Sequence, residues 1–286
     1  MKITLSQYAG FCDGVKRAYE MVAALDMEHV KRPVFILGTL VHNPSVNEKI
    51  EAKGIEKIEG EKFFAARSSE IGTIIITAHG TGPDVYAHAE KIGAEVVDAT
   101  CPKVIKVQRL AKIYRKRGYR IVIVGDRGHK EVRGIDDWGG GGAVIISDEN
   151  DLKSMKFDPE EKIAVLAQTT QNEDFFRSVG AYLKEKYSAV EILATTCHTT
   201  HERQIEIRKL AGENGAVLVI GSDTSANSKR LFEIAREINP RTYFVESADD
   251  IKNIDLAGME SVAVTAGAST PEWIIEEVVK CLAGDI

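Results

Sequence analysis

The sequence predicts an α/β protein made of three similar modules whose sheets are mainly parallel. Several short segments, among them IIIT, IVIVG, IAVLA, VLVIG and VAVTA, are continuously apolar, as expected of parallel strands buried on both faces. Segments between them carry apolar residues at helical spacing, and strands that alternate with helices give the α/β class. One such helical segment has Val104, Val107, Leu110, Ala111 and Tyr114 on one face.

Three cysteines mark an internal repeat. Cys12, Cys101 and Cys197 lie 89 and 96 residues apart, and each follows an expected strand and precedes an expected helix. We therefore expect a pseudo-threefold (trefoil) arrangement of modules around a common centre, with the strand before Cys12 in the first module. The expected modules are residues 1–98, 99–195 and 196–286.

Polar residues recur after other expected strands. Each cysteine is followed, 28 to 30 residues later, by a polar residue at the end of a strand, and a third strand in each module again ends in polar residues. Ligands of open parallel sheets bind at such carboxyl ends, so we expect these side chains to surround one ligand. They are His42, His129 and Asn227 after the earlier strand, and His79, Thr169, Thr170 and Ser269 after the later one.

Composition narrows the class of protein. The chain has 286 residues, of which 44% are apolar and 28% charged, as in ordinary globular proteins. A net charge of −6 and no evident basic face argue against a nucleic-acid partner. We expect no secretory signal, because the N-terminal residues lack an uninterrupted apolar segment and a small-residue cleavage site, and the sequence has no apolar run of about 18 residues. We expect a cytoplasmic protein without a membrane partner, in which four cysteines serve a metal or cluster better than disulfides.

Three distant cysteines that meet at one metal centre leave one coordination position open. Structural zinc usually has four protein ligands, often with CxxC spacing, and no CxxC occurs here. Three cysteines fit a [4Fe–4S] cluster with one iron not ligated by protein, which can act as a Lewis acid and an electron donor. Each cysteine alone is also consistent with a small buried apolar residue. Cys281, in an amphipathic segment outside the repeat, is expected to be such a residue.

Two further patterns point to no site. His198 and His201 are spaced to share one helical face, but no carboxylate–histidine pattern completes a metal site. The segment WGGGGA at 138–143 lacks the GxGxxG order of a dinucleotide-binding turn and follows no strand. It is expected to form a flexible loop.

The chain contains, in order, the motifs AGFCDGVKRA, GTLVHNPSV, TAHGTGP, VDATCPKV, GDRGHKEV, LAQTT, GSDTSANS and GAST. From Phe11 to Pro271 it resembles the LytB/IspH family of 4-hydroxy-3-methylbut-2-enyl diphosphate reductases. The resemblance implies three α/β domains around one central [4Fe–4S] cluster per chain, with one iron not ligated by protein. It implies reduction of this allylic diphosphate, with two electrons and two protons, to isopentenyl and dimethylallyl diphosphate. This is the last step of the non-mevalonate (MEP/DOXP) pathway, with an electron donor such as ferredoxin or flavodoxin.

The resemblance also implies roles for individual residues. Glu131 matches the acid that donates a proton, and His129 and Thr169 match residues that contact the substrate near its hydroxyl group. The implied cluster ligands are Cys12, Cys101 and Cys197. The residues that match diphosphate-binding positions are His42, His79, Ser225, Asn227 and Ser269.

Three positions depart from the family pattern. Ala226 stands where many members have serine, which removes one hydroxyl donor to the diphosphate. Lys130 stands where proline is usual beside the acid, and we expect its side chain to face water. Asp13 follows the first cysteine, where its negative charge suits a helix start.

Two other functions remain open from the residues alone. A hydro-lyase would use an open cluster iron as a Lewis acid without net electron transfer. An iron–sulfur sensor or scaffold would need a surface for a macromolecule, and none is evident. The polar residues expected around a small anion favour an enzyme.

Overall fold

The computed structural model describes residues 1–284, and the chain divides into two compact units. Unit 1 comprises Met1–Val15, His42–Val46 and the described part of Cys197–Ile286, whereas unit 2 comprises Lys16–Val41 and Asn47–Thr196. Two helices, α1 (Asp13–Ala23) and α2 (Pro44–Glu51), begin in unit 1 and end in unit 2. Within residues 1–284, no helix is both long and apolar enough to cross a membrane.

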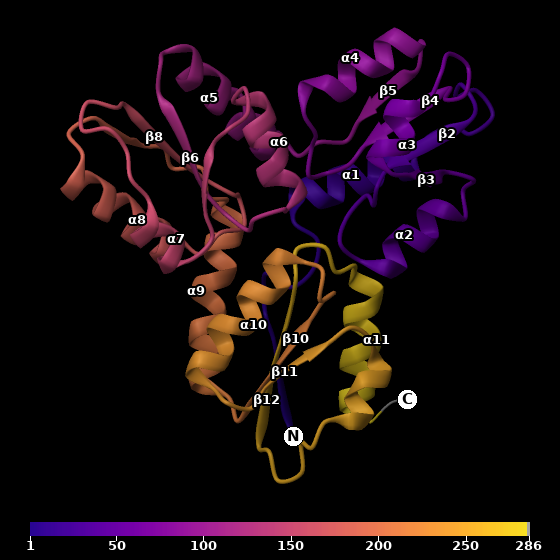
Figure 1. Ribbon diagram of the computed structural model, residues 1–286. Helices are drawn as coiled ribbons and strands as arrows, with labels where there is room; N and C mark the ends of the chain where they lie inside the picture. The colour runs from indigo at the N-terminus through magenta and orange to yellow at the C-terminus, as the bar shows by residue number, and fades with distance from the viewer. Residues whose placement is uncertain (285–286) are drawn as a thin grey trace. The chain divides into compact units, whose positions relative to one another are not determined.

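Unit 1 is built on one four-stranded parallel sheet in the order β1-β12-β10-β11. Helices α9 and α10 pack on one face of this sheet and α11 on the other (Figure 1). The elements are β1 (Lys2–Leu5), β10 (Ala216–Ile220), β11 (Thr242–Val245), β12 (Ser261–Ala266), α9 (His198–Glu213), α10 (Ala226–Ile238), α11 (Glu272–Ala283) and the 3-10 helix η1 (Ala248–Asn253).

Unit 2 contains two further parallel sheets. The first has the order β3-β2-β4-β5, and helices α3 and α4 pack against it. Its elements are β2 (Val34–Leu37), β3 (Glu56–Ile58), β4 (Thr73–Ile76), β5 (Glu95–Asp98), α3 (Gly60–Ala65) and α4 (Pro83–Ile92).

The second sheet of unit 2 has the order β7-β6-β8-β9. Helices α5 and α6 cover one face and α7 and α8 the other (Figure 1). Its elements are β6 (Arg120–Val124), β7 (Val144–Ile146), β8 (Ile163–Ala167), β9 (Val190–Ile192), α5 (Pro102–Lys116), α6 (Lys130–Trp138), α7 (Glu149–Ser154) and α8 (Glu173–Lys186).

The predicted α/β class with three similar parallel-sheet modules is confirmed. Every residue of β4, β8 and β10 is buried, in agreement with their continuously apolar sequences.

The helices carry the expected end signals. Asn172 caps α8 by accepting hydrogen bonds from the second and third helical N–H groups, and Gly93 ends α4 in the left-handed conformation.

The N-terminal strand differs from the prediction. We expected β1 in the first module, but it pairs with β12, so that Ile3 lies beside Val262. Strand β1 is therefore an edge strand of the sheet in unit 1. It corresponds to the edge strands β5 and β9 of the other two sheets. The spacing of the cysteines identifies the repeat but not the sheet that a terminal strand joins. The remaining module boundaries stay a prediction.

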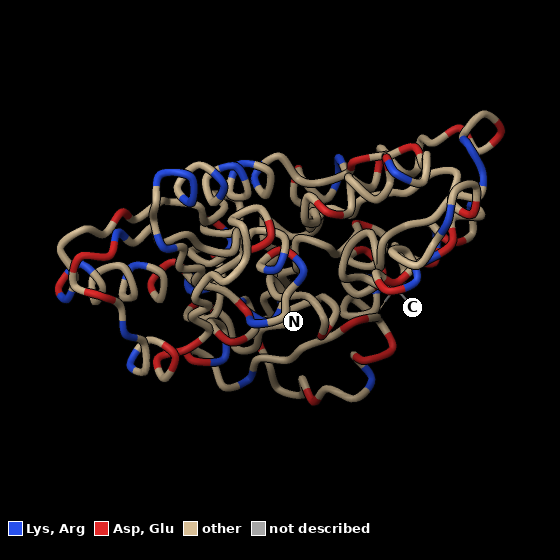
Figure 2. The backbone as a smooth tube through the Cα atoms, turned by 45° about the horizontal axis from the view of Figure 1, so that its top comes forward, with Lys and Arg blue, Asp and Glu red and all other residues tan. Residues whose placement is uncertain are grey.

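Charged residues of both signs are distributed along the backbone (Figure 2). Ion pairs between residues three or four apart lie on exposed helix surfaces, such as Lys153–Glu149 and Lys252–Asp249. Exposed pairs of this kind contribute little to stability. The fold is therefore held mainly by the apolar clusters between sheets and helices.

Helix α3 offers a matched test of this packing. Phe63 is fully buried against the first sheet of unit 2, whereas its neighbour Phe64 is 43% exposed. Phe63→Ala should lower the free energy of unfolding by about 3–5 kcal/mol because it leaves a cavity. Phe64→Ala should change it by about 0.5 kcal/mol or less. Urea denaturation of both variants checks this, and equal losses would contradict the assigned packing.

Candidate functional site

Each of the three repeated cysteines directly precedes a helix. Cys12 stands before α1, while Cys101 and Cys197 are the N-cap residues of α5 and α9. In unit 1 the Cys12 N–H donates to the Ala268 carbonyl at 3.2 Å, and in unit 2 the Cys101 N–H donates to the Ala78 carbonyl at 3.0 Å. A helix N-terminus stabilises negative charge, so these positions suit thiolate ligands. None of the four cysteines forms a disulfide.

A buried arginine links the two cysteine segments of unit 1. Arg203 lies on α9, is 4% exposed, and donates hydrogen bonds to the Gly10 carbonyl at 2.7 Å and the Ala266 carbonyl at 3.0 Å. Burial lowers the pKa of Arg203, whereas the nearby Cys12 and Cys197 raise it. Its Nε is buried without a hydrogen-bond partner among the described residues. This donor and the positive charge suit an anionic group held by Cys12 and Cys197.

Sequence reasoning missed Arg203, although a signal was present. Arg203 falls at helical spacing with Thr200, Gln204 and Ile207, and all four are buried in α9. An arginine on the inward stripe of a helix rarely stays buried without an anionic or hydrogen-bonding partner. The position of Arg203 on the inward face of the helix after Cys197 is the pattern that identifies it.

The loops of unit 1 bring together four of the predicted diphosphate-binding residues. Ser225 caps α10 by accepting a hydrogen bond from the Ser228 N–H. The Ser269 hydroxyl lies 3.1 Å from the His42 carbonyl and 3.4 Å from the Ser225 hydroxyl. Asn227, in the first turn of α10, is buried, and neither polar atom of its side chain has a partner among the described residues. A buried amide without partners beside a helix N-terminus suits an anion.

The loops of unit 2 hold a buried acid. Glu131, in the first turn of α6, is 3% exposed. The Thr169 N–H donates to Glu131 Oε1 at 2.6 Å, and the Thr169 hydroxyl donates to Oε2 at 3.0 Å. Burial raises the pKa of Glu131 to about 7; the hydrogen bonds from Thr169 act in the opposite direction and Asp126 adds a small increase. Near neutral pH the group can therefore both hold and release a proton.

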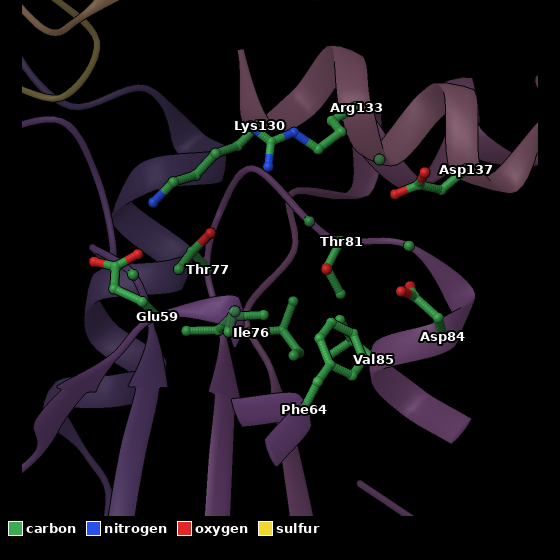
Figure 3. Close-up of a pocket in the computed structure, with 16 residues that line it drawn as sticks. Glu59, Phe64, Ile76, Thr77, Thr81, Asp84, Val85, Lys130, Arg133 and Asp137 are labelled. Atoms are coloured by element: carbon green, nitrogen blue, oxygen red, sulfur yellow. The ribbon is translucent and has the colours of Figure 1, made fainter. Parts of the chain in front are cut away.

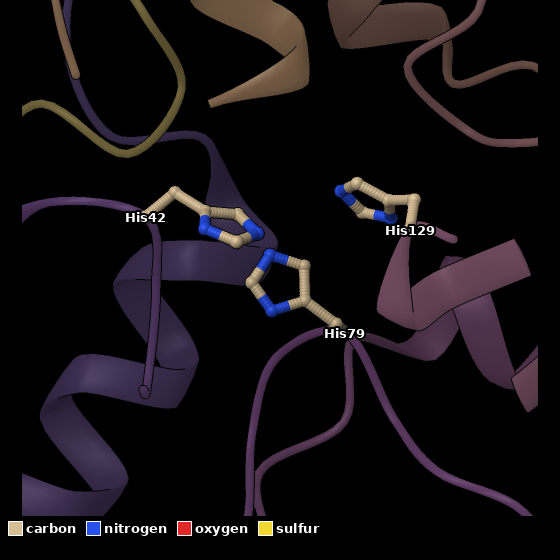
Figure 4. Close-up of side chains that lie close together, drawn as sticks. All are labelled: His42, His79 and His129. Carbon is tan, nitrogen blue, oxygen red and sulfur yellow. The ribbon is translucent and has the colours of Figure 1, made fainter. Parts of the chain in front are cut away.

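Two histidines lie beside one another in unit 2. The His79 and His129 rings meet edge to face with their centroids 5.5 Å apart (Figure 4). His129 is the N-cap of α6, and its Nδ1 accepts a hydrogen bond from the Glu131 N–H at 3.2 Å. Burial lowers the pKa of His129. The neutral ring therefore carries its proton on Nε2, which can donate a hydrogen bond to a ligand.

A pocket of about 200 Å³ opens beside this region of unit 2. Lys130 and Arg133 from α6 face it together with Glu59, Asp84 and Asp137 (Figure 3). The volume is below that of ordinary small-molecule sites, which begin at about 300 Å³. Because both basic and acidic side chains line the pocket, it does not favour a ligand of either charge.

The expectation that Lys130 faces water is wrong in part, because its side chain is half-buried and lines this pocket. Burial lowers the pKa of Lys130 and Glu59 raises it. A Cβ on Gly38 would collide with Lys130 Nζ, so the ammonium group rests against this glycine. The sequence could not reveal the space that Gly38 leaves.

The other predicted features have structural or surface positions. Cys281 lies on α11, apart from the repeat, with its thiol 3.7 Å from the carbonyl of Ala248 in η1; the residue is half-buried and not fully buried as expected. His198 is exposed and lies 3.4 Å from Glu202. Three of the four glycines at 139–142 have positive φ, in line with the expected loop. Asp13 is the first residue of α1, as expected.

The structure thus assembles two groups of predicted residues, each within one unit. Unit 1 holds Cys12, Cys197, His42, Ser225, Asn227 and Ser269. Unit 2 holds Cys101, His79, His129, Glu131 and Thr169.

Comparison with known proteins gives consistent matches over nearly the whole chain. The model of the LytB protein family matches residues 3–283. The 4-hydroxy-3-methylbut-2-enyl diphosphate reductase of Geobacter sp. (strain M21) is 39% identical over 98% of this chain and 96% of its own length. The enzyme of the same name from Aquifex aeolicus (strain VF5) is 36% identical over 96% of this chain and 94% of its own.

Solved structures match as well. The structure of the E-1-hydroxy-2-methyl-but-2-enyl-4-diphosphate reductase from Plasmodium falciparum is 28% identical, with a TM-score of 0.90 over 99% of this chain and 88% of that chain. A structure of (E)-4-hydroxy-3-methyl-but-2-enyl diphosphate reductase, described as the terminal enzyme of the non-mevalonate pathway, is 33% identical, with a TM-score of 0.68 over 99% of this chain and 100% of that chain.

The raised pKa of Glu131 predicts a pH-dependent stability. In the folded chain the pKa of Glu131 is about 7, whereas the ordinary pKa of this group is 4.5. Its stabilising contribution is therefore complete below pH 4.5 and is lost as pH rises through 7. Glu131→Gln keeps the shape of the side chain but cannot ionise. The free energy of unfolding of this variant minus that of the original chain should therefore rise by about 3 kcal/mol between pH 4.5 and 8.

Urea unfolding at several pH values measures this difference. Glu173→Gln, which changes an acid on α8 whose carboxylate accepts from Thr196 and pairs with Arg177, is the control. A difference between Glu131→Gln and the original chain that stays constant with pH would contradict the assignment.

Proposed function

The chain belongs to the LytB family, and on that premise we propose that it is a 4-hydroxy-3-methylbut-2-enyl diphosphate reductase of the non-mevalonate pathway. In this reaction the allylic hydroxyl leaves as water, and two electrons and two protons convert the substrate to isopentenyl or dimethylallyl diphosphate. The observation that carries the proposal is the buried acid Glu131, held by Thr169 with a pKa of about 7.

We propose that Cys12, Cys101 and Cys197 hold one [4Fe–4S] cluster, with one iron not ligated by protein. The donor set fits, because each cysteine precedes a helix N-terminus and the buried charge of Arg203 lies near two of them. When bound, such a cluster supplies electrons and a Lewis-acidic iron. Cys281 has no part in this site.

The substrate diphosphate would bind to Ser225, Asn227, Ser269 and the two histidines His42 and His79. The buried Asn227 amide and the first turn of the thirteen-residue helix α10 supply donors to phosphate oxygens. Ala226, at the start of the same helix, adds no hydroxyl group. Its backbone N–H remains able to donate, so this departure weakens the diphosphate site without removing it.

At the hydroxyl end of the substrate, Glu131 would donate the proton that lets the oxygen leave as water. The two hydrogen bonds from Thr169 fix both carboxyl oxygens of Glu131, so the proton is held in a set direction. The neutral His129 ring would orient the hydroxyl through its Nε2–H. Burial of both groups keeps bulk water from competing for these hydrogen bonds.

Anaerobic turnover tests the activity. The purified protein should oxidise reduced methyl viologen only when 4-hydroxy-3-methylbut-2-enyl diphosphate is present, and Glu131→Gln should slow this by about 10²–10⁴-fold. Viologen oxidation without substrate dependence, or none at all, would refute the proposal. Conversion of the substrate without any reductant would point to a hydro-lyase instead.

The division of the thiols has its own test. Cys101→Ser should abolish cluster assembly, whereas Cys281→Ser should leave about four iron atoms per chain, as expected for a [4Fe–4S] centre. Iron and acid-labile sulfide analysis with Mössbauer spectroscopy measures both, and one iron signal should change on addition of the substrate. Equal loss of iron in the two variants would show that the assignment of ligands is wrong.

A further inference from the structure

Helix α5 carries an exposed basic face that the sequence analysis overlooked. The helix contains six Lys or Arg residues and no Asp or Glu. Val104, Val107, Gln108 and Ala111 are buried, and Val107 and Ala111 pack against the sheet. The α5 basic face is the opposite side, formed by the exposed residues Lys106, Arg109, Lys112 and Lys116.

The charge of the α5 basic face is largely uncompensated. Among the described residues, no salt bridge involves Lys106, Arg109 or Lys116. Lys112 lies over the Trp138 ring, with Nζ 4.7 Å from its centroid. One acid, Asp98, lines a hollow with Arg109 and Lys112, and it accepts hydrogen bonds from Tyr86 and Thr100. A local excess of positive charge on a chain with a net charge of −6 indicates an acidic partner.

Apolar groups lie between the basic side chains. Ile113 is 43% exposed, and Pro102, Ile105 and Leu110 line a shallow hollow together with Lys106 and Arg109. An apolar patch with a charged rim is the usual anatomy of a protein–protein interface. A small patch of this kind suits a transient partner, as electron-transfer complexes bury little surface.

The α5 basic face begins beside Cys101, one of the proposed cluster ligands. Cys101 is the N-cap of α5, and the exposed residue Pro102 follows it directly. From there the face extends along the helix for about 20 Å at 1.5 Å per residue. A partner bound over the first two turns would therefore lie close to a proposed cluster ligand.

We propose that the α5 basic face is the docking surface for a small acidic ferredoxin that reduces this enzyme. The proposal rests on the function proposed above, which requires electrons from outside the chain. Each reduced ferredoxin gives up one electron, so two are oxidised for each substrate molecule. Two protons are taken up in the same turnover, and the substrate hydroxyl leaves as water.

Charge reversal at the start of the face tests the proposal. Lys106→Glu combined with Arg109→Glu should raise the KM for reduced ferredoxin about tenfold, because electrostatic steering is lost. Turnover with methyl viologen should be unchanged, since this small reductant needs no docking surface. The KM of the original enzyme for ferredoxin should also rise with ionic strength, and that of the variant much less.

A second variant with the same change in net charge is the control. Lys184→Glu combined with Lys209→Glu alters exposed residues of α8 and α9, and the KM for ferredoxin should stay near its original value. An equal rise in both variants would overturn the docking surface in favour of an effect of net charge.

The remaining outcomes separate the two proposals. Absence of substrate-dependent viologen oxidation in the original protein would refute the enzyme function itself. Intact viologen turnover with an unchanged KM for ferredoxin in the α5 variant would overturn only the docking surface. Binding of a double-stranded oligonucleotide at 150 mM salt by the original chain and not by the α5 variant would assign the face to nucleic acid and overturn the proposal.

Discussion

All strands of a parallel sheet end at the same edge, and every side chain of the proposed site depends on this constraint. The edge strands β1, β5 and β9 lead to Cys12, Cys101 and Cys197, and a helix begins directly after each cysteine. The same connection thus sets the place of each thiol and supplies a helix N-terminus that favours its anionic form. One repeated strand–loop–helix unit accounts for both position and electrostatics.

The two units treat buried charge in opposite ways, and both serve the proposed chemistry. Unit 1 buries a permanent cation, Arg203, in the neighbourhood of Cys12 and Cys197. Unit 2 buries an acid, Glu131, and this burial raises its pKa to about 7; the hydrogen bonds from Thr169 oppose the rise, and no cation among residues 1–284 forms an ion pair with it. The first arrangement holds negative charge in place, whereas the second keeps a proton available at neutral pH.

The sequence predicted the sheets, the helices after the cysteines and the residues at the strand ends, because periodicity and local motifs determine these. The sheet joined by β1 depends on a pairing between residues about 260 positions apart, which no local pattern reports. Burial of Arg203 and of Lys130 depends on which neighbours leave room for them. The α5 basic face escaped notice because its charges recur every three or four residues and form a surface only once the helix exists.

The pairing of β1 with β12 also has a consequence for synthesis. Strand β1 is made about 260 residues before its partner β12, and the Cys12 N–H reaches its acceptor only once Ala268 has been added. When the chain reaches residue 196, the sequence of unit 2 is complete, whereas unit 1 still lacks β10, β11 and β12. A chain that ended before β12 would therefore leave Cys12, one cysteine of the proposed set, without this backbone contact.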